Sequence, residues 1–240
     1  MKAFLYGVAL QWKLDIRSKT LLITCYIVPL LFFAVMGGIF TSINPEAKST
    51  LIQSMTVMGV SMGALIGLPP SLAEIYGSDI KKVYKANGVP LYLGLITTVL
   101  SAFLHLLLMS AILYAAALLA FDAAPPANPV SYFGALAVFA AASLGIGSVL
   151  GLSVKNQAKL TMLEQLVFLP SILLSGILFP AGLLPRAFET IGWLFPASWG
   201  YRWMTCEGPL LGNGWPLAVM AAAAAAAVLC GLRLKRLESE

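Results

Sequence analysis

Residues 91–121 read LYLGLITTVLSAFLHLLLMSAILYAAALLAF, a run that contains no Asp, Glu, Lys or Arg. A helix of about 20 apolar residues crosses the hydrocarbon core of a bilayer, so this run is long enough to cross it and to tilt or protrude. Transmembrane β-strands instead alternate in hydropathy over about ten residues. The run therefore predicts a membrane-spanning helix.

The composition of the whole chain agrees with a membrane protein. Of its 240 residues, 60% are hydrophobic and 10% are charged, whereas about 25% of the residues in an ordinary soluble domain are charged. So few charges cannot cover a water-soluble fold, and intrinsic disorder would need low hydrophobicity. We expect an all-α integral membrane protein with a single transmembrane domain over 1–240 and six spans, at 21–40, 51–73, 91–121, 130–154, 165–185 and 215–232.

The basic residues predict the orientation, because Lys and Arg collect in cytoplasmic loops. With the N-terminus in the cytoplasm, only Lys48, Arg186 and Arg202 lie outside. The other basic residues lie inside: Lys2, Lys13, Arg17, Lys19, Lys81, Lys82, Lys85, Lys155, Lys159, Arg233, Lys235 and Arg236. We expect a multi-pass protein of the plasma (inner) membrane with both termini in the cytoplasm. This bias accounts for the net charge of +5, and we expect no nucleic-acid partner.

Residues 1–20 predict an amphipathic helix at the membrane surface. Phe4, Val8, Trp12 and Ile16 recur every four residues, and the charged residues fall mainly off that line. Such a helix lies in the interface with its apolar side in lipid, so Trp12 is expected at headgroup depth. Two roles stay open, a simple anchor and a mechanical element.

Glycines spaced by four mark two of the predicted spans. Gly59, Gly63 and Gly67 lie in one span, and Gly147 and Gly151 lie in another. Small residues let helices approach closely in lipid. We expect these glycines to pack helices within one chain, and contact between chains is the alternative.

A polar stripe follows one face of the 91–121 span and contains Thr98, Ser101 and His105, the only histidine. An ionisable group at this depth faces the protein interior or a water-filled cavity. His105 is expected to bond a neighbouring helix as a neutral group or, together with Thr98 and Ser101, to line a transport path. The first four predicted spans contain no Asp or Glu, which argues against proton coupling.

Motifs for catalysis are missing from the sequence. It contains no G-x-S-x-G elbow, no H-E-x-x-H helix and no G-x-x-x-x-G-K-[ST] phosphate-binding loop. We therefore expect that the chain is not an enzyme and holds no metal, cofactor or ATP of its own.

The predicted inner loop over 74–90 reads EIYGSDIKKVYKANGVP. Ser78 can cap a short helix over 79–86, and the pair Asn87-Gly88 can end it. The lysines of this helix would form its exposed face. A plain cytoplasmic loop with positive charge is the alternative.

The predicted outer segment reads SGILFPAGLLP over 175–185 and IGWLFP over 191–196. Its prolines interrupt an apolar stretch that is too broken for another span. Such a segment can enter the membrane only where protein shields its backbone, so we expect a re-entrant segment on the outer side.

With these two segments the chain resembles the membrane subunits of type-2 ATP-binding-cassette (ABC) exporters. The resemblance covers the whole chain and is most specific at S-G-I-x-F-P-x-x-x-L-P followed by I-x-x-x-F-P over 175–196. The inner loop resembles the coupling segment of that family. Ser78 and Asp79 stand where Gly-Thr is usual, and Asn87-Gly88-Val89-Pro90 replaces the usual end.

The resemblance implies that a separate ATPase subunit binds ATP and Mg²⁺ and grips the inner loop. It also implies that two permease chains, identical or paralogous, share one transporter. The residues then expected to couple the chain to the ATPase are Glu74, Asp79, Lys81, Lys82, Tyr84 and Lys85. An outer gate is expected at Gly176, Pro180, Pro185 and Pro196.

We therefore expect the permease subunit of an ATP-driven exporter. Aromatic residues of the first and fifth spans, among them Phe32 and Phe168, favour an amphipathic, lipid-like, drug or peptide cargo. The alternatives are an ATP-independent channel or secondary transporter that uses His105, and a membrane scaffold with no transported solute.

Overall fold

The computed structural model describes residues 2–43, 48–178, 184–205 and 215–239. Every regular element in these ranges is a helix, which confirms the all-α prediction for them. In chain order the helices are α1 Lys2–Arg17, α2 Lys19–Leu22, η1 Ile23–Ile27, α3 Val28–Ile43, α4 Leu51–Met62, η3 Gly63–Gly67, α5 Leu68–Gly77, α6 Ile80–Ala86, α7 Leu91–Phe121, α8 Pro129–Ser153, α9 Gln157–Leu173, α10 Arg186–Gly192, α11 Pro196–Thr205 and α12 Trp215–Ser239.

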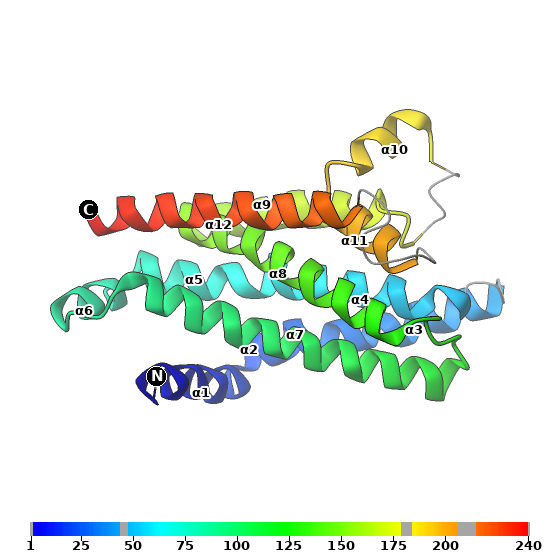
Figure 1. The fold of residues 1–240 in the computed structure, drawn as a ribbon, viewed down its shortest axis with the longest axis horizontal. Coiled ribbons are helices and arrows are strands. Elements are labelled where there is room, and N and C mark those ends of the chain that lie inside the picture. Colours follow the sequence, from blue (N-terminus) through cyan, green and yellow to red (C-terminus); the bar gives the residue numbers. More distant parts are fainter. Residues whose placement is uncertain (1, 44–47, 179–183, 206–214, 240) are drawn as a thin grey trace.

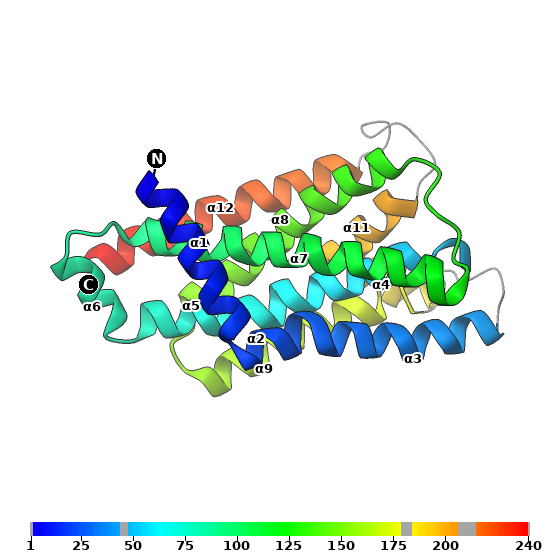
Figure 2. The same cartoon turned by 90° about the horizontal axis from the view of Figure 1, so that it is seen from below.

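These helices form an elongated bundle with two distinct ends (Figure 1). Both chain termini and α6 lie at one end, and α10 and α11 lie at the other (Figures 1 and 2). Within the bundle, α8 packs on α5 and α12, and α7 packs on α4 and α1.

Among the described residues, four helices are long and apolar enough to cross a membrane: Ile23–Ile43, Leu51–Gly77, Leu91–Phe121 and Pro129–Ser153. They lie where the first four spans were expected. The second continues past the expected end at residue 73 to Gly77, and α8 is displaced by one residue from 130–154.

α9 differs from the range 165–185 expected for the fifth span. It begins at Gln157, because Asn156 Oδ1 accepts a hydrogen bond from the Lys159 backbone N–H at 3.0 Å and caps the helix. It ends at Leu173. Beyond it, Gly176 has a φ of +87°, a left-handed conformation that glycine adopts at little cost, so the chain turns there.

Two π-helical turns interrupt the first two long helices, and prolines account for both. η1 precedes Pro29, and η3 precedes Pro69 and Pro70. Proline has no N–H, and its ring clashes with the carbonyl four residues earlier, so the helix widens at that point. The two wide turns contact each other.

The glycines expected to pack helices do so within the chain. A Cβ atom on Gly147 would lie 2.0 Å from the Ala64 carbonyl oxygen, and one on Gly151 would lie 2.7 Å from that of Pro69. α8 therefore touches the backbone of η3 and α5 directly. Of the four long apolar helices, Leu51–Gly77 is the most deeply buried.

α1 is turned differently from the sequence prediction. The Trp12 ring stacks on the His105 ring of α7, with centroids 3.9 Å apart and planes 4° apart. The exposed apolar side chains of α1 include Tyr6, Leu10, Leu14 and Ile16, and of these only Ile16 belongs to the predicted line. The prediction that the line through Trp12 faces lipid is therefore wrong at Trp12, because this side chain packs on a ring of α7. Figure 2 shows α1 crossing the bundle obliquely over α7.

Candidate functional site

α6, between α5 and α7, is the first candidate site and lies at the end of the bundle that holds both termini (Figure 1). Ser78 Oγ accepts a hydrogen bond from the Ile80 backbone N–H at 3.3 Å. The Asp79 carbonyl accepts hydrogen bonds from the N–H groups of Lys82 and Val83. These bonds start the short helix at the predicted place.

The end of α6 is a glycine cap. Gly88 has a φ of +65°, and the Val89 N–H donates to the Tyr84 carbonyl at 2.9 Å. This bond across a left-handed glycine is the Schellman arrangement, which satisfies the last carbonyls of a helix. The predicted stop at Asn87-Gly88 is confirmed.

The surface of α6 is exposed and mixed in character. Lys82 Nζ lies 2.7 Å from Asp79 Oδ1, and both side chains face solvent. This hydrogen bond and the opposite charges lower the pKa of Asp79 and raise the pKa of Lys82. An ion pair this exposed adds little stability, so its charges remain available to a partner. Val83 is also exposed and adds an apolar group.

Two tyrosines fasten α6 to the bundle. The hydroxyl of the buried Tyr76 donates to the Leu91 carbonyl at 2.6 Å, which ties the end of α5 to the start of α7. The half-buried Tyr84 packs on α7 at Gly94, where an added Cβ would lie 2.8 Å from Tyr84 Cε2. Of the predicted coupling residues, Tyr84 therefore faces the protein, whereas Glu74, Asp79 and Lys82 face solvent.

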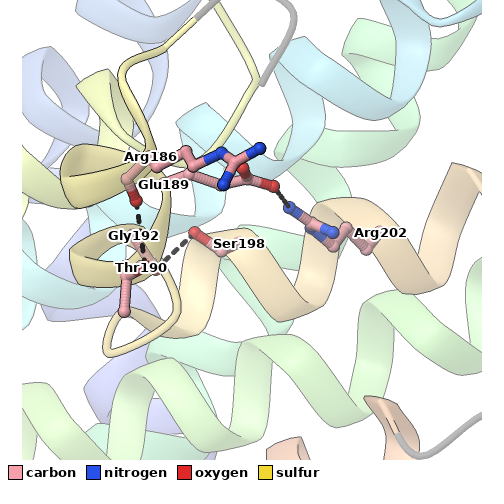
Figure 3. A network of polar contacts seen from close by, with 6 residues as sticks. All are labelled: Arg186, Glu189, Thr190, Gly192, Ser198 and Arg202. Carbon is pink, nitrogen blue, oxygen red and sulfur yellow. Dashed lines mark hydrogen bonds and ion pairs between the residues drawn. The ribbon is translucent and has the colours of Figure 1, made fainter. Parts of the chain in front are cut away.

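The outer segment forms a helical corner at the opposite end (Figure 3). Ser198 Oγ of α11 donates to the Gly192 carbonyl of α10 at 2.7 Å, and Arg202 pairs with Glu189 at 3.6 Å. Arg202 also lies over the Trp193 ring, 4.4 Å from its centroid. These contacts fix α10 against α11.

The corner is seated on the rest of the bundle. A Cβ on Gly192 would lie 2.4 Å from the Leu174 carbonyl oxygen, and one on Gly200 would lie 2.4 Å from Phe139 Cδ2. α11 contacts α4, α8, α9 and α12. Its backbone is thus shielded by protein, which is the condition for a re-entrant segment.

The predicted gate residues lie at the turns of this outer segment. Gly176 follows α9, Pro185 caps α10, and Pro196 begins α11. Pro185 is exposed, whereas Pro196 is buried. Pro180 lies outside the described residues.

A cavity of about 640 Å³ lies between the starts of α4 and α8, the 124–128 connection and the end of α11. Its lining includes Gln53, Ser131, Tyr132 and Trp203. Gln53 Oε1 and Trp203 Nε1 are buried without a hydrogen-bond partner in the described part of the chain. The sequence did not predict this cavity, because its walls come from four separate segments.

The polar stripe of α7 faces α1 and η1. Ser101 Oγ donates to Asp15 Oδ2 at 2.5 Å, and Gln11 Nε2 donates to Asp15 Oδ1 at 2.9 Å. The Tyr26 hydroxyl lies 2.6 Å from His105 Nδ1. Thr98, Ser101 and His105 are all buried here.

Asp15 is the member of this cluster that sequence reasoning missed. In the sequence it is one of the charged residues that fall off the apolar line of the N-terminal helix. A signal was present, because Gln11, Trp12 and Asp15 are spaced by three and four and share one helix face. That face is the one that packs on α7.

Comparisons with known proteins bear on the whole chain. The family model of the ABC-2 type transporter matches residues 3–205, from α1 to the end of α11. No curated protein sequence matches the chain.

Proposed function

Because the chain belongs to the ABC-2 type transporter family as a membrane permease subunit, we propose that it is the permease half of an ATP-driven exporter. The structure of α6 is the main support for this proposal. This helix is capped at both ends, packed on α7 through Tyr84, and exposes the Asp79–Lys82 ion pair to solvent. A rigid helix held this way can transmit a push from a partner into α5 and α7.

We propose that a separate ATPase subunit binds ATP and Mg²⁺ and receives α6. Closure of that subunit can shift the permease between states only through contacts that differ between the states. Glu74, Asp79, Lys81, Lys82 and Lys85 would supply those contacts, and Tyr84 would hold α6 in place.

The chain is a multi-pass membrane protein, and we propose that α9 and α12 complete six crossings. With 17 and 25 residues, they are about 25 and 37 Å long. Both run along the bundle between its two ends (Figures 1 and 2). The distribution of Lys and Arg supports placing the end with α6 in the cytoplasm.

We propose that a second copy or a paralogue completes the permease along α3 and α9. The end of η1 and α3 together expose Ile27, Leu31, Val35 and Ile39 at a spacing of four. α9 exposes an apolar face of its own, made of Met162, Leu166, Leu169 and Leu173. Two apolar faces of this length suit pairing between permease subunits, as the resemblance to type-2 exporters implies.

An amphipathic cargo is the substrate class that we propose. The outer cavity combines polar groups such as Gln53 and Ser131 with apolar groups such as Pro125 and Met204. A molecule with one polar and one apolar side would be matched there as it leaves the permease through the corner near Pro196.

The test replaces Lys81, Lys82 and Lys85 with Glu in the complex with its ATPase. We expect at least a tenfold loss of ATP-dependent transport in vesicles, because the reversed charges repel the partner surface. Folding should persist, since Lys82 is exposed. Elution as a single peak and an unchanged melting temperature would check this.

Lys82→Glu and Lys159→Glu form a matched pair of single controls, because both lysines are exposed and both are expected in the cytoplasm. Only Lys82→Glu should lower transport. Full transport by the triple variant would contradict the role of α6. Transport by the permease without any ATPase would contradict the proposal as a whole.

A further inference from the structure

Asp15 is a buried carboxylate without a cationic partner among the described residues. Its side chain is 6% exposed, and its two hydrogen-bond donors, Ser101 and Gln11, are both neutral. Lys13 and Arg17, its basic neighbours on α1, are exposed. A buried carboxylate that keeps its full charge is costly unless a positive charge or a proton neutralises it.

His105 of α7 lines the same small cavity as this carboxylate. Ser101, which bonds Asp15, lies one helical turn from His105 on the same face of α7. Trp12, three residues before Asp15, stacks on the His105 ring. The contacts between α1 and α7 therefore place the side chains of Asp15 and His105 close together.

The surroundings of His105 suit a protonated ring. Its Nδ1 lies 2.6 Å from the Tyr26 hydroxyl oxygen, which can accept a hydrogen bond. Its Nε2 is buried and has no hydrogen-bond partner in the described chain. The indole face of Trp12 attracts a cation placed over it. An imidazolium donates from both nitrogens, so Nδ1–H would bond the Tyr26 hydroxyl and Nε2–H would need a further acceptor.

A small cavity joins the two side chains. Asp15, His105 and Thr98 line a space of about 10 Å³, which is the size that holds one water molecule. Thr98 Oγ1, like His105 Nε2, lacks a partner in the described residues. One water there could accept from His105 Nε2 and donate to Asp15, with Thr98 as a further partner.

We infer that Asp15 and His105 form a proton-binding site, in which His105 is an imidazolium and Asp15 is its counter-ion across a single water molecule. The proton comes from cytoplasmic water and leaves the pair with no net charge. The other titratable groups that face the site are Cys25 and Tyr26 of η1. η3 and α5 contribute only uncharged groups, namely Gly63, Gly67, Leu68 and Ser71.

The proton holds α1 on α7. Below the pH at which the pair releases its proton, the pair is neutral and α1 stays packed. Above that pH, a net negative charge remains in a buried site, and Asp15 has to move toward water. The docking of α1 is therefore present at lower pH and is lost as the pH rises through the release point.

The decisive measurement uses the fact that His105 is the only histidine of the chain. The full-length protein, purified with a histidine-free tag and labelled with ¹⁵N-histidine in lipid nanodiscs, gives a single pair of imidazole nitrogen signals. We expect both ring nitrogens to carry a proton at pH 7, because Asp15 lies beside the ring as a counter-ion. A ring with only one protonated nitrogen at pH 7 would overturn the inference.

Asp15→Asn tests the counter-ion, and Asp122→Asn is its control. Asp122 is an exposed carboxylate at the end of α7 with a φ of +48°, a conformation that Asn tolerates. Asp15→Asn should lower the affinity of His105 for its proton at least tenfold, and Asp122→Asn should leave it unchanged. Equal midpoints in wild type and Asp15→Asn would overturn the pairing.

Hydrogen exchange of α1 supplies a readout that does not depend on the imidazole signals. Protection factors over residues 2–17 should fall as the pH rises through the wild-type midpoint. In Asp15→Asn they should show no such step. Ser101→Ala keeps both titratable groups, so it should keep the step and a protonated His105 at pH 7 even if Asp15→Asn folds poorly. A wild-type protein without the step would contradict the proton-dependent docking.

Discussion

Gly147 lies where the backbones of α8 and η3 approach each other closely. An added Cβ would lie 2.0 Å from the Ala64 carbonyl oxygen, with the Ala64 carbonyl carbon next nearest at 3.1 Å. Backbone atoms cannot rotate aside as a flexible side chain can, so the two helices would have to separate.

Gly147→Ala is therefore expected to destabilise the protein by about 1–3 kcal/mol, the usual cost of overpacking a close contact. Thermal unfolding of the purified protein, followed by circular dichroism, would measure the loss. Gly231→Ala is the matched control, because nothing lies within 4 Å of its Cβ position in α12. Alanine favours a helix over glycine, so the control should melt at the same temperature or higher. An unchanged melting temperature for Gly147→Ala would contradict the packing.

Two caps define α6 at the scale of the element. Its glycine cap depends on the left-handed φ of Gly88, around which nothing lies within 4 Å. A side chain at this position would be limited by backbone strain and not by space. Substitutions at Gly88 can therefore test the backbone conformation of the cap without a steric clash.

Gly88→Ala should strain the cap by about 1 kcal/mol and lower ATP-dependent transport severalfold, because a frayed α6 transmits less movement. Gly88→Asn should retain more activity, since Asn tolerates the left-handed region better than Ala does. Transport assays in vesicles with the ATPase present would compare the two. Equal activity of Gly88→Ala and the wild type would show that the cap does not matter for coupling.

The corner of α10 and α11 is the second element with a measurable constraint. The buried bond from Ser198 Oγ to the Gly192 carbonyl joins the two helices (Figure 3). Ser198→Ala should cost about 1 kcal/mol and increase leak of solute through the permease. Dye leak from vesicles would detect this, with Thr190→Ala as the control because the Thr190 hydroxyl donates to the Arg186 carbonyl of its own helix. A leak equal to that of the control would argue against a gate at this corner.

Pro180→Ala extends the same hypothesis to the predicted gate residue outside the described chain. If proline shapes the gate, this variant should change export or leak. Wild-type export combined with wild-type leak would count against the hypothesis.

At the scale of the whole molecule, the proposed roles of α6 and of the corner of α10 and α11 depend on which end of the bundle lies in the cytoplasm. Single cysteines at Ser78 beside α6 and at Ala124 beyond α7 lie at opposite ends of a 31-residue helix. A membrane-impermeant maleimide should label Ser78→Cys only from the cytoplasmic side and Ala124→Cys only from the outside, in a background in which Cys25, Cys206 and Cys230 are replaced by Ser. Labelling of Ser78→Cys from the outside would invert the proposed topology.

The long charge-free runs and their separation determined that the chain is helical and membrane-embedded. A helix in lipid must satisfy its backbone bonds internally, so a run such as 91–121 has few alternatives. The caps of α6 were equally local, because Ser78, Asn87 and Gly88 act on their own turns. These properties depend on neighbours in sequence, and sequence patterns report them well.

Tertiary structure alone decided which faces meet. The position of α1 depends on a partner for Asp15 some 86 residues away in the chain, and no local period encodes that distance. The amphipathic pattern could not tell a face buried in lipid from one buried against protein, because both exclude water. The fold selected the second by placing Ser101 and His105 opposite Asp15 and Trp12. In this way the fold placed a buried acid, Asp15, beside a predicted span that contains no acid of its own.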